Sequence, residues 1–178
     1  MGGFIDATLA VIADNRAWTA PIAFLFAFGE TLALVSILIP STAILIGIGA
    51  LASTGAIDFL PLWIGAAVGA VAGSTVSWWA GWLFGERMLS LWPLSKAPEN
   101  VSRGVELFRR WGVLAVVIGH FFGPFRSVVF LLAGATRLGF LRFQLVNVPA
   151  ALAWAWVVPK TGEVGGDIAG AIWRALGL

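Results

Sequence analysis

Three titratable residues lie inside long apolar stretches, and their types are the ones that could do chemistry. Glu30 is the single charged residue between positions 21 and 52, while His120 and Arg126 interrupt the apolar stretch 111–136. A charge in membrane hydrocarbon costs about 3 kcal/mol or more, so such side chains normally face one another, the protein interior or a wet cavity. Their presence therefore requires a structural or a functional reason.

Both kinds of reason are open for Glu30 and Arg126. A salt bridge between them would hold the two apolar stretches together. Alternatively, Arg126 binds phosphate, because a guanidinium group presents a planar set of donors and stays charged. Glu30 would then exchange protons, because burial favours its protonated form and a nearby arginine favours the ionised form. His120 can titrate near neutrality and can also donate to phosphate.

The residues for other chemistries are few. There is no cysteine and His120 is the only histidine, so disulfides are excluded and a transition-metal site has almost no ligands. A nucleophile with an adjacent base is not indicated, since Ser127 beside Arg126 is too little, and there is no glycine-rich phosphate loop. We predict no enzymatic activity, no metal and no cofactor.

The composition predicts that lipid surrounds the chain. Of 178 residues, 60% are hydrophobic and 11% are charged, against roughly 25% charged in soluble domains. Mean hydropathy is +0.94, and ten tryptophans fit membrane interfaces. The net charge of +2 gives no basic face for nucleic acid. We expect one all-α membrane domain over 1–178, beginning at Met1 without a secretory leader.

Two broken apolar segments must position the titratable residues. The segment 21–52 is too long for one straight span and contains Pro40, and the segment 111–136 is interrupted by Gly123 and Pro124. Proline removes a backbone donor and clashes with the preceding turn. We therefore predict a re-entrant helical hairpin in each segment, with a kinked full span as the alternative for the first.

Transmembrane helices are predicted at 59–85 and 140–159. The first has no charge, and small residues recur along it at every fourth position from Gly65 to Gly85, which favours close packing of another helix. A short C-terminal helix is expected at 163–178, too brief to cross alone unless it continues the previous helix. Residues 4–18 read as a short interfacial helix.

An amphipathic helix is predicted at 95–110, in the densest cluster of Lys and Arg. Val101, Val105 and Phe108 share one helical face, and the order Glu99 to Arg103 and Glu106 to Arg110 favours i,i+4 ion pairs. The positive-inside rule places this helix in the cytoplasm. Its charges form either a solvated face, which we favour, or a lipid-headgroup contact.

A weak internal repeat relates the two broken segments. Gly49 and Ala50, followed by Gly55, correspond to Gly134 and Ala135, followed by Gly139, at a period of about 85 residues. Inverted repeats with broken helices meeting at mid-membrane are a recurrent transporter plan. The match is short, so chance similarity is the competing explanation.

Around these residues the chain resembles the DedA family of bacterial membrane proteins, in the VTT-domain (SNARE-associated) superfamily that includes lipid scramblases. The resemblance covers about 28–162. It is carried by the run from His120 through Pro124 to Arg126, then Leu132-Ala133-Gly134, Phe140 or Phe143, Asn147 and Trp154, and by Glu30 followed by Pro40-Ser41-Thr42. His120 stands where the family has arginine, and Ser41 and Thr42 stand where it has glycine and an acid.

The resemblance implies a multi-pass protein of the bacterial inner membrane that translocates undecaprenyl phosphate or a phospholipid, often with proton coupling. The implied substrate residues are Arg126, His120, Glu30, Thr42, Ser41 and Asn147, with Glu30 also coupling protons. We hypothesise a lipid-phosphate flippase. A proton-coupled small-ion antiporter and a non-transporting assembly factor are the alternatives, and homo-oligomerisation is left open.

Overall fold

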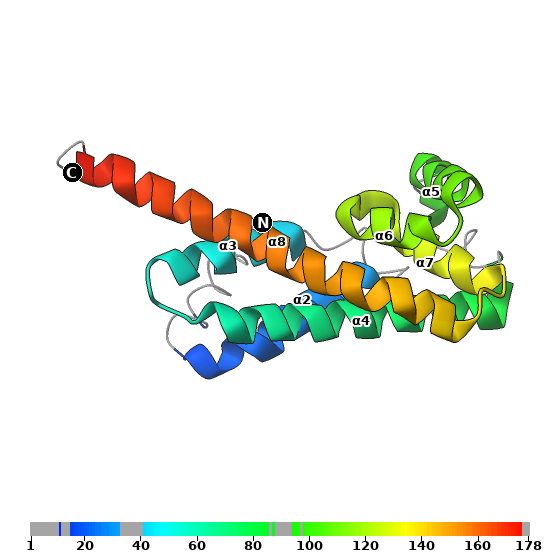
Figure 1. Ribbon diagram of the computed structural model, residues 1–178, viewed down its shortest axis with the longest axis horizontal. Helices are drawn as coiled ribbons and strands as arrows, with labels where there is room; N and C mark the ends of the chain where they lie inside the picture. The colour runs from blue at the N-terminus through cyan, green and yellow to red at the C-terminus, as the bar shows by residue number, and fades with distance from the viewer. Residues whose placement is uncertain are drawn as a thin grey trace.

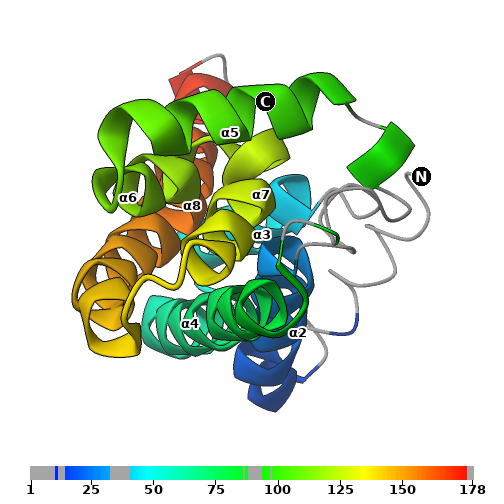
Figure 2. The same cartoon turned by 90° about the vertical axis from the view of Figure 1, so that its right-hand side faces the viewer.

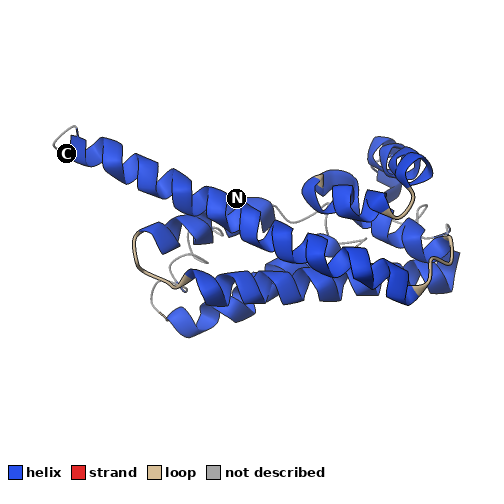
Figure 3. Cartoon of the chain, in the orientation of Figure 1, coloured by secondary structure: helices blue, strands red, loops and turns tan. Residues whose placement is uncertain are grey.

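The computed structural model describes residues 11, 15–32, 41–85, 87, 94–96 and 98–175. Within these residues the secondary structure is helical and contains no strand (Figure 3), so the all-α prediction is confirmed. The elements are η1 (Arg16–Trp18), α2 (Thr19–Thr31), α3 (Ser41–Ser53), α4 (Phe59–Phe84), η3 (Leu94–Lys96), α5 (Pro98–Trp111), α6 (Leu114–Phe121), α7 (Gly123–Ala135) and α8 (Phe140–Ala175).

Among the described residues, two helices are long and apolar enough to cross a membrane, namely α4 and the part of α8 from Phe140 to Ile168. At 1.5 Å per residue, the 26 residues of α4 extend about 39 Å, beyond the roughly 30 Å of bilayer hydrocarbon. Both helices run along the long axis of the molecule, and α2, α3, α6 and α7 lie against them (Figure 1).

In the C-terminal part of the chain, the residues expected at 140–159 and 163–178 follow the stated alternative, in which the last helix continues the previous one. The structure has one helix, α8, which continues through Pro149 and Pro159 to Ala175. Two contacts stabilise the helix beyond Pro159. Lys160 and Glu163 form an ion pair of 2.8 Å across the expected boundary, and Gly162 lies against the backbone of α3 at Ile46.

The small residues of α4 form the seam expected from their spacing. An added Cβ at Gly65 or Gly69 would collide with the backbone of α2, at Ala20 and Phe24 respectively. Farther along, Gly81 lies against the backbone of α7 at Leu131. Helices associate in lipid through such close packing, because the hydrophobic effect does not drive them together there. One side of α4 therefore holds helices from both halves of the chain.

Two helix pairs meet through reciprocal glycine contacts, α3 with α8 and α7 with α4. In each pair, a glycine of one helix lies against the backbone of the other, and the reverse also holds. The contacts are Gly49 with Pro159 and Gly162 with Ile46 in the first pair, and Gly134 with Trp78 and Gly81 with Leu131 in the second. Ile46 and Leu131 have the same separation in sequence, about 85 residues, as Gly49 and Gly134.

The second apolar segment is broken where Gly123 and Pro124 predict it. Helix α6 ends at Phe121, and Phe122, with φ −111° and ψ 80°, caps both α6 and α7. Pro124 lies in the first turn of α7, where its missing N–H costs no helical hydrogen bond. In the first segment, α2 ends at Thr31 and α3 begins at Ser41, and Pro40 lies outside the described residues.

Helix α5 lies across α6 and α7 at one end of the bundle (Figure 2). Of its predicted apolar face, Val101 and Phe108 pack against the core, whereas Val105 is exposed. Glu99 pairs with Arg103 as predicted. The predicted pair of Glu106 with Arg110 is wrong, because Glu106 reaches Arg109 at 3.0 Å instead. The expected interfacial helix at 4–18 lies mostly outside the described residues.

Candidate functional site

Glu30 and Arg126 meet in the interior. Glu30 is in the last turn of α2 and Arg126 is in the first turns of α7. Arg126 Nη2 lies 2.6 Å from Glu30 Oε1, and the two side chains are 0% and 6% exposed. Arg126 Nε also donates to the backbone carbonyl of Glu30 at 3.3 Å. The salt bridge considered from the sequence is thus present and joins the two broken segments.

Two further elements contribute to the surroundings of this pair. Thr42, in the first turn of α3, donates its hydroxyl to Glu30 Oε1 at 2.5 Å. The indole ring of Trp154 on α8 lies 4.6 Å from the Arg126 guanidinium carbon, in a cation–π arrangement. The side chain of Ser41 lies outside what the structure describes. Helices from both halves of the chain therefore converge on one arginine.

His120 is near the same arginine and is anchored on its other side. Its backbone carbonyl is 3.5 Å from Arg126 Nη1, and its ring nitrogen Nε2 is 3.0 Å from Asn147 Oδ1. The ring also packs against Phe130 with centroids 4.8 Å apart. Both His120 and Asn147 are fully buried, so their polar atoms depend on these partners rather than on bulk water.

A directed chain of hydrogen bonds continues from His120 to α4. Asn147 Nδ2 donates to Gln144 Oε1 at 2.9 Å, Gln144 Nε2 donates to Thr75 Oγ1 at 2.8 Å, and Thr75 donates to the carbonyl of Val71. Because Thr75 uses its proton on Val71, it accepts from Gln144. A carbonyl oxygen can only accept, so Asn147 Oδ1 requires His120 Nε2 to be the donor.

This direction determines which nitrogen of the neutral imidazole carries the proton. With the proton on Nε2, the Nδ1 lone pair is free to accept. Nδ1 is buried, and no described group forms a hydrogen bond with it. The same holds for Glu30 Oε2. Two buried acceptor atoms beside Arg126 thus lack donors within the described part of the chain, and such atoms require an explanation.

The chemistry open to this arrangement is binding of an anion and of protons. Arg126 supplies a buried cation, and Glu30 Oε2 and His120 Nδ1 are atoms where a proton or a ligand donor would bind. The described residues contain no group of three His, Cys, Asp or Glu side chains that could hold a metal ion.

The structure brings together Glu30, Thr42, His120, Arg126 and Asn147 from the predicted set. Sequence reasoning missed the roles of Trp154, Gln144 and Thr75. Gln144 and Asn147 are three positions apart in an apolar helix, and this spacing of two amides was a usable signal because such residues share a helical face. Thr75 gave no signal, since a threonine is an ordinary residue in an uncharged membrane helix.

Comparison with known proteins gives a consistent set of relatives. The model of the VTT domain matches residues 39–163. The inner membrane protein YabI of Escherichia coli is 29% identical over 144 residues, 80% of this chain and 56% of the relative. Protein DedA of Escherichia coli is 28% identical over 169 residues, 92% of this chain and 77% of the relative.

An uncharacterized membrane protein of Mycobacterium tuberculosis is 32% identical over 123 residues, 66% of this chain and 56% of the relative. The chain spans somewhat more than half the length of most of these relatives, including YabI at 56%. No solved structure matches the chain. YabI and the mycobacterial relative are named as membrane proteins, and none of the three names states a substrate.

Proposed function

Because the chain belongs to the VTT-domain family of DedA-type membrane proteins, we propose that it translocates a lipid with a phosphate headgroup across the bacterial inner membrane. The headgroup binds at Arg126, the tail stays in hydrocarbon, and Glu30 couples the movement to protons. The observation that carries the proposal is the fully buried Arg126, whose counter-ion Glu30 has a second carboxylate oxygen without a described partner.

Re-entrant arms on both sides of the site would let a headgroup reach this depth. Helices α2, α3 and α7 have 13 residues each and α6 has 8. A 13-residue helix extends about 20 Å, short of the roughly 30 Å needed to cross the hydrocarbon. Each of these four helices is therefore suited to enter the membrane part of the way, and a broken backbone is tolerated there where protein surrounds it.

An inverted repeat is the arrangement that would place the two hairpins face to face. The reciprocal glycine contacts support it, since α3 packs on α8 in the way that α7 packs on α4. The residues at these contacts recur at the period found in the sequence. In transporters of this plan the substrate site lies between the repeats, at the helix breaks. Glu30 and Arg126 are adjacent to the two breaks.

Proton coupling follows from competition for one cation. A phosphate group and the Glu30 carboxylate both bind guanidinium donors. When a proton binds to Glu30 Oε2, the carboxylate loses its charge, and Arg126 becomes available to the phosphate. When the lipid leaves, Arg126 again attracts the carboxylate, and the proton is released. The proton therefore binds as the headgroup enters and leaves as the headgroup departs.

Translocation in proteoliposomes tests the proposal. Vesicles loaded with a short-chain polyprenyl phosphate should show protein-dependent translocation that Arg126→Ala abolishes at equal protein level. Arg109→Ala is the matched control, because Arg109 is an exposed arginine on α5. Unchanged translocation by Arg126→Ala would remove this function.

A membrane assembly factor without transport is the second candidate. It is favoured by the fact that Arg126 already forms an ion pair within the protein. Arg126 already has a carboxylate, a carbonyl of α2 and an indole ring as partners, as expected of a structural link between segments. A swapped pair, Glu30→Arg with Arg126→Glu, distinguishes the two. A link regains cellular function in the swapped protein, whereas a phosphate site does not.

A further inference from the structure

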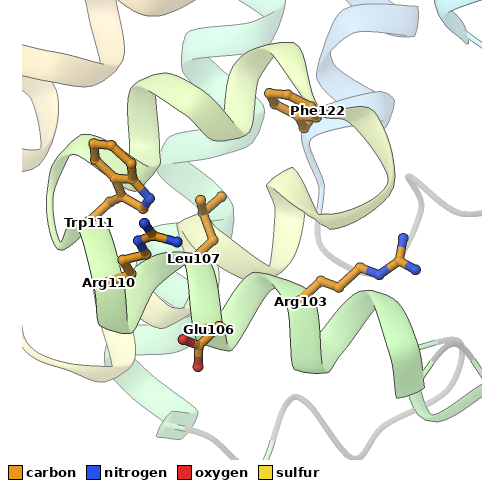
Figure 4. Close-up of a pocket in the computed structure, with 6 residues that line it drawn as sticks. All are labelled: Arg103, Glu106, Leu107, Arg110, Trp111 and Phe122. Carbon is orange, nitrogen blue, oxygen red and sulfur yellow. The ribbon is translucent and has the colours of Figure 1, made fainter.

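A groove lies between α5 and the turn that joins α6 to α7, outside the site at Arg126. Its volume is about 440 Å³, and its lining residues are Arg103, Glu106, Leu107, Arg110, Trp111 and Phe122. The volume falls within the range of small-ligand sites. The groove combines basic side chains with apolar ones, as Figure 4 shows.

The charges of the groove favour an anion. Glu106, its only acid, pairs with Arg109 at 3.0 Å, and its carboxylate points away from Leu107 and Arg110 in Figure 4. Arg110 extends toward Trp111, with its guanidinium carbon 5.8 Å from the indole ring centre. Arg103 has Glu99 at 3.9 Å and is 68% exposed. Arg110 therefore has no carboxylate partner among the described residues, whereas Arg103 has this long, exposed contact with Glu99 and extends away from Arg110 in Figure 4.

The apolar part of the groove favours a hydrocarbon chain beside that anion. Trp111 is 46% exposed and Phe122 is 54% exposed, and large aromatic side chains this exposed in one place usually mark an interaction surface. An amphipathic helix with a basic face and a tryptophan is suited to the headgroup level of a membrane. These rings would not contribute to the binding of an anion that has no apolar part.

The groove and the site at Arg126 share the helix break at Phe122. Phe122, which lines the groove, is the residue that caps both α6 and α7. His120 lies two residues before it and Arg126 four residues after it, both buried. A ligand leaving the groove past Phe122 would therefore meet the break that leads to Arg126.

We propose that this groove is a second lipid-phosphate site, at which the headgroup is captured before it moves to Arg126. Arg110 binds the phosphate, Arg103 adds positive charge at the other end of the groove, and Trp111, Leu107 and Phe122 contact the first methylene groups of the tail. The groove is far smaller than a whole lipid, so the rest of the tail stays in the membrane. This inference rests on the proposed function for the direction of movement, but binding at the groove is tested separately.

Photo-crosslinking in vesicles tests the groove. The probe is a lipid monophosphate with a diazirine in the tail near the headgroup, and labelled peptides that contain Trp111 and Phe122 are counted by mass spectrometry. The double variant Arg103→Gln/Arg110→Gln should lower this labelling about fivefold or more. The matched control Arg142→Gln should label like the unaltered protein, since Arg142 is an exposed arginine of α8 that does not line the groove.

Three further arms separate the alternatives. Arg126→Ala should keep the groove labelling while translocation is lost, so a failure of the proposed function and a failure of the groove give different results. A diacylglycerol probe with the same tail should label weakly, and excess inorganic phosphate should not displace the lipid probe. Equal labelling of the double variant, equal labelling by the uncharged probe, displacement by inorganic phosphate, or loss of labelling in Arg126→Ala would each overturn the proposal.

Discussion

The pair of Glu30 and Arg126 and the pairs along α5 use the same residue types in opposite environments. Glu30 and Arg126 are 6% and 0% exposed and lie 2.6 Å apart. Glu106 and Arg109 are 61% and 78% exposed at 3.0 Å. The distances are similar, so distance does not separate the two cases. The two pairs differ in their exposure to water, because water screens the charges of the exposed pair and is displaced from the buried one.

This difference shows which ion pairs of the protein depend on one particular partner and which can exchange it. On α5, the expected partner of Glu106 was Arg110, and Arg109 took its place, since water solvates whichever arginine is left over. Inside the bundle, no such exchange is available. Removing one member of a buried pair leaves the other charge without a partner, and this costs several kcal/mol of stability. Replacing both members by apolar residues of similar size costs far less.

The largest effect is expected from removing one member of the buried pair. Arg126→Met should destabilise the protein by about 3–5 kcal/mol, because Glu30 is left buried without a counter-charge. Adding Glu30→Leu should recover most of that loss, since both charges are then absent. Thermal unfolding of the purified proteins in detergent measures both. Equal stability of the single variant would show that water reaches the site freely.

A second way to sharpen the comparison is to add one charge of each sign near the buried pair. His120→Arg places a second permanent cation near Arg126, and Thr42→Asp places an acid beside Glu30. Each change alone adds one uncompensated charge, so each should destabilise. Together they should show a favourable coupling of about 2 kcal/mol in a double-mutant cycle. Additive effects would mean that positions 42 and 120 do not share one electrostatic environment.

The hydrogen-bond chain should give an intermediate effect. Asn147→Leu leaves His120 Nε2 and Gln144 Oε1 without their partners, at a cost of about 1 kcal/mol. Thr161→Val is the control on the same helix, because its hydroxyl is exposed and donates only to the carbonyl of Val158. Detergent unfolding curves compare the two. Similar midpoints would indicate that the chain adds no stability.

The smallest effect is expected on α5. Glu106→Gln removes the acid of an exposed ion pair and should change stability by less than about 0.5 kcal/mol. Added salt should reduce even this difference, because exposed charges are screened. Unfolding at low and high salt measures both quantities. A cost comparable to that of Arg126→Met would contradict the exposed position of this pair.

Several features of the fold could be predicted because they depend on the summed hydropathy of a segment or on the backbone chemistry of single residues. Helix α4 begins and ends within one residue of the expected 59–85, since a charge-free run bounded by Asp58 and Gly85 has few alternatives. Pro124 marks the break between α6 and α7 through its missing N–H. The helix continues past Lys160, Thr161 and Gly162, which from the sequence indicate a helix end. Gly162 is instead a packing residue against α3.

The candidate site could be predicted only in its charged members. Glu30 and Arg126 are conspicuous because their cost in hydrocarbon is high in any arrangement. Trp154, Gln144 and Thr75 have ordinary places in membrane helices, so their roles follow from contacts and not from type. The state of His120 likewise depends on a chain of three partners on two other helices.

The sequence by itself predicted lipid as the surroundings of the chain, the helical class, the break at Pro124 and the residues that need partners. Each of these follows from composition or from the chemistry of single residues. Only the tertiary structure decided which partner each of them has. Arg126 and the Glu30 carbonyl to which it donates are 96 residues apart, and no local rule acts across that separation. Packing of glycine against backbone brought the helices together, and that geometry selected the contacts.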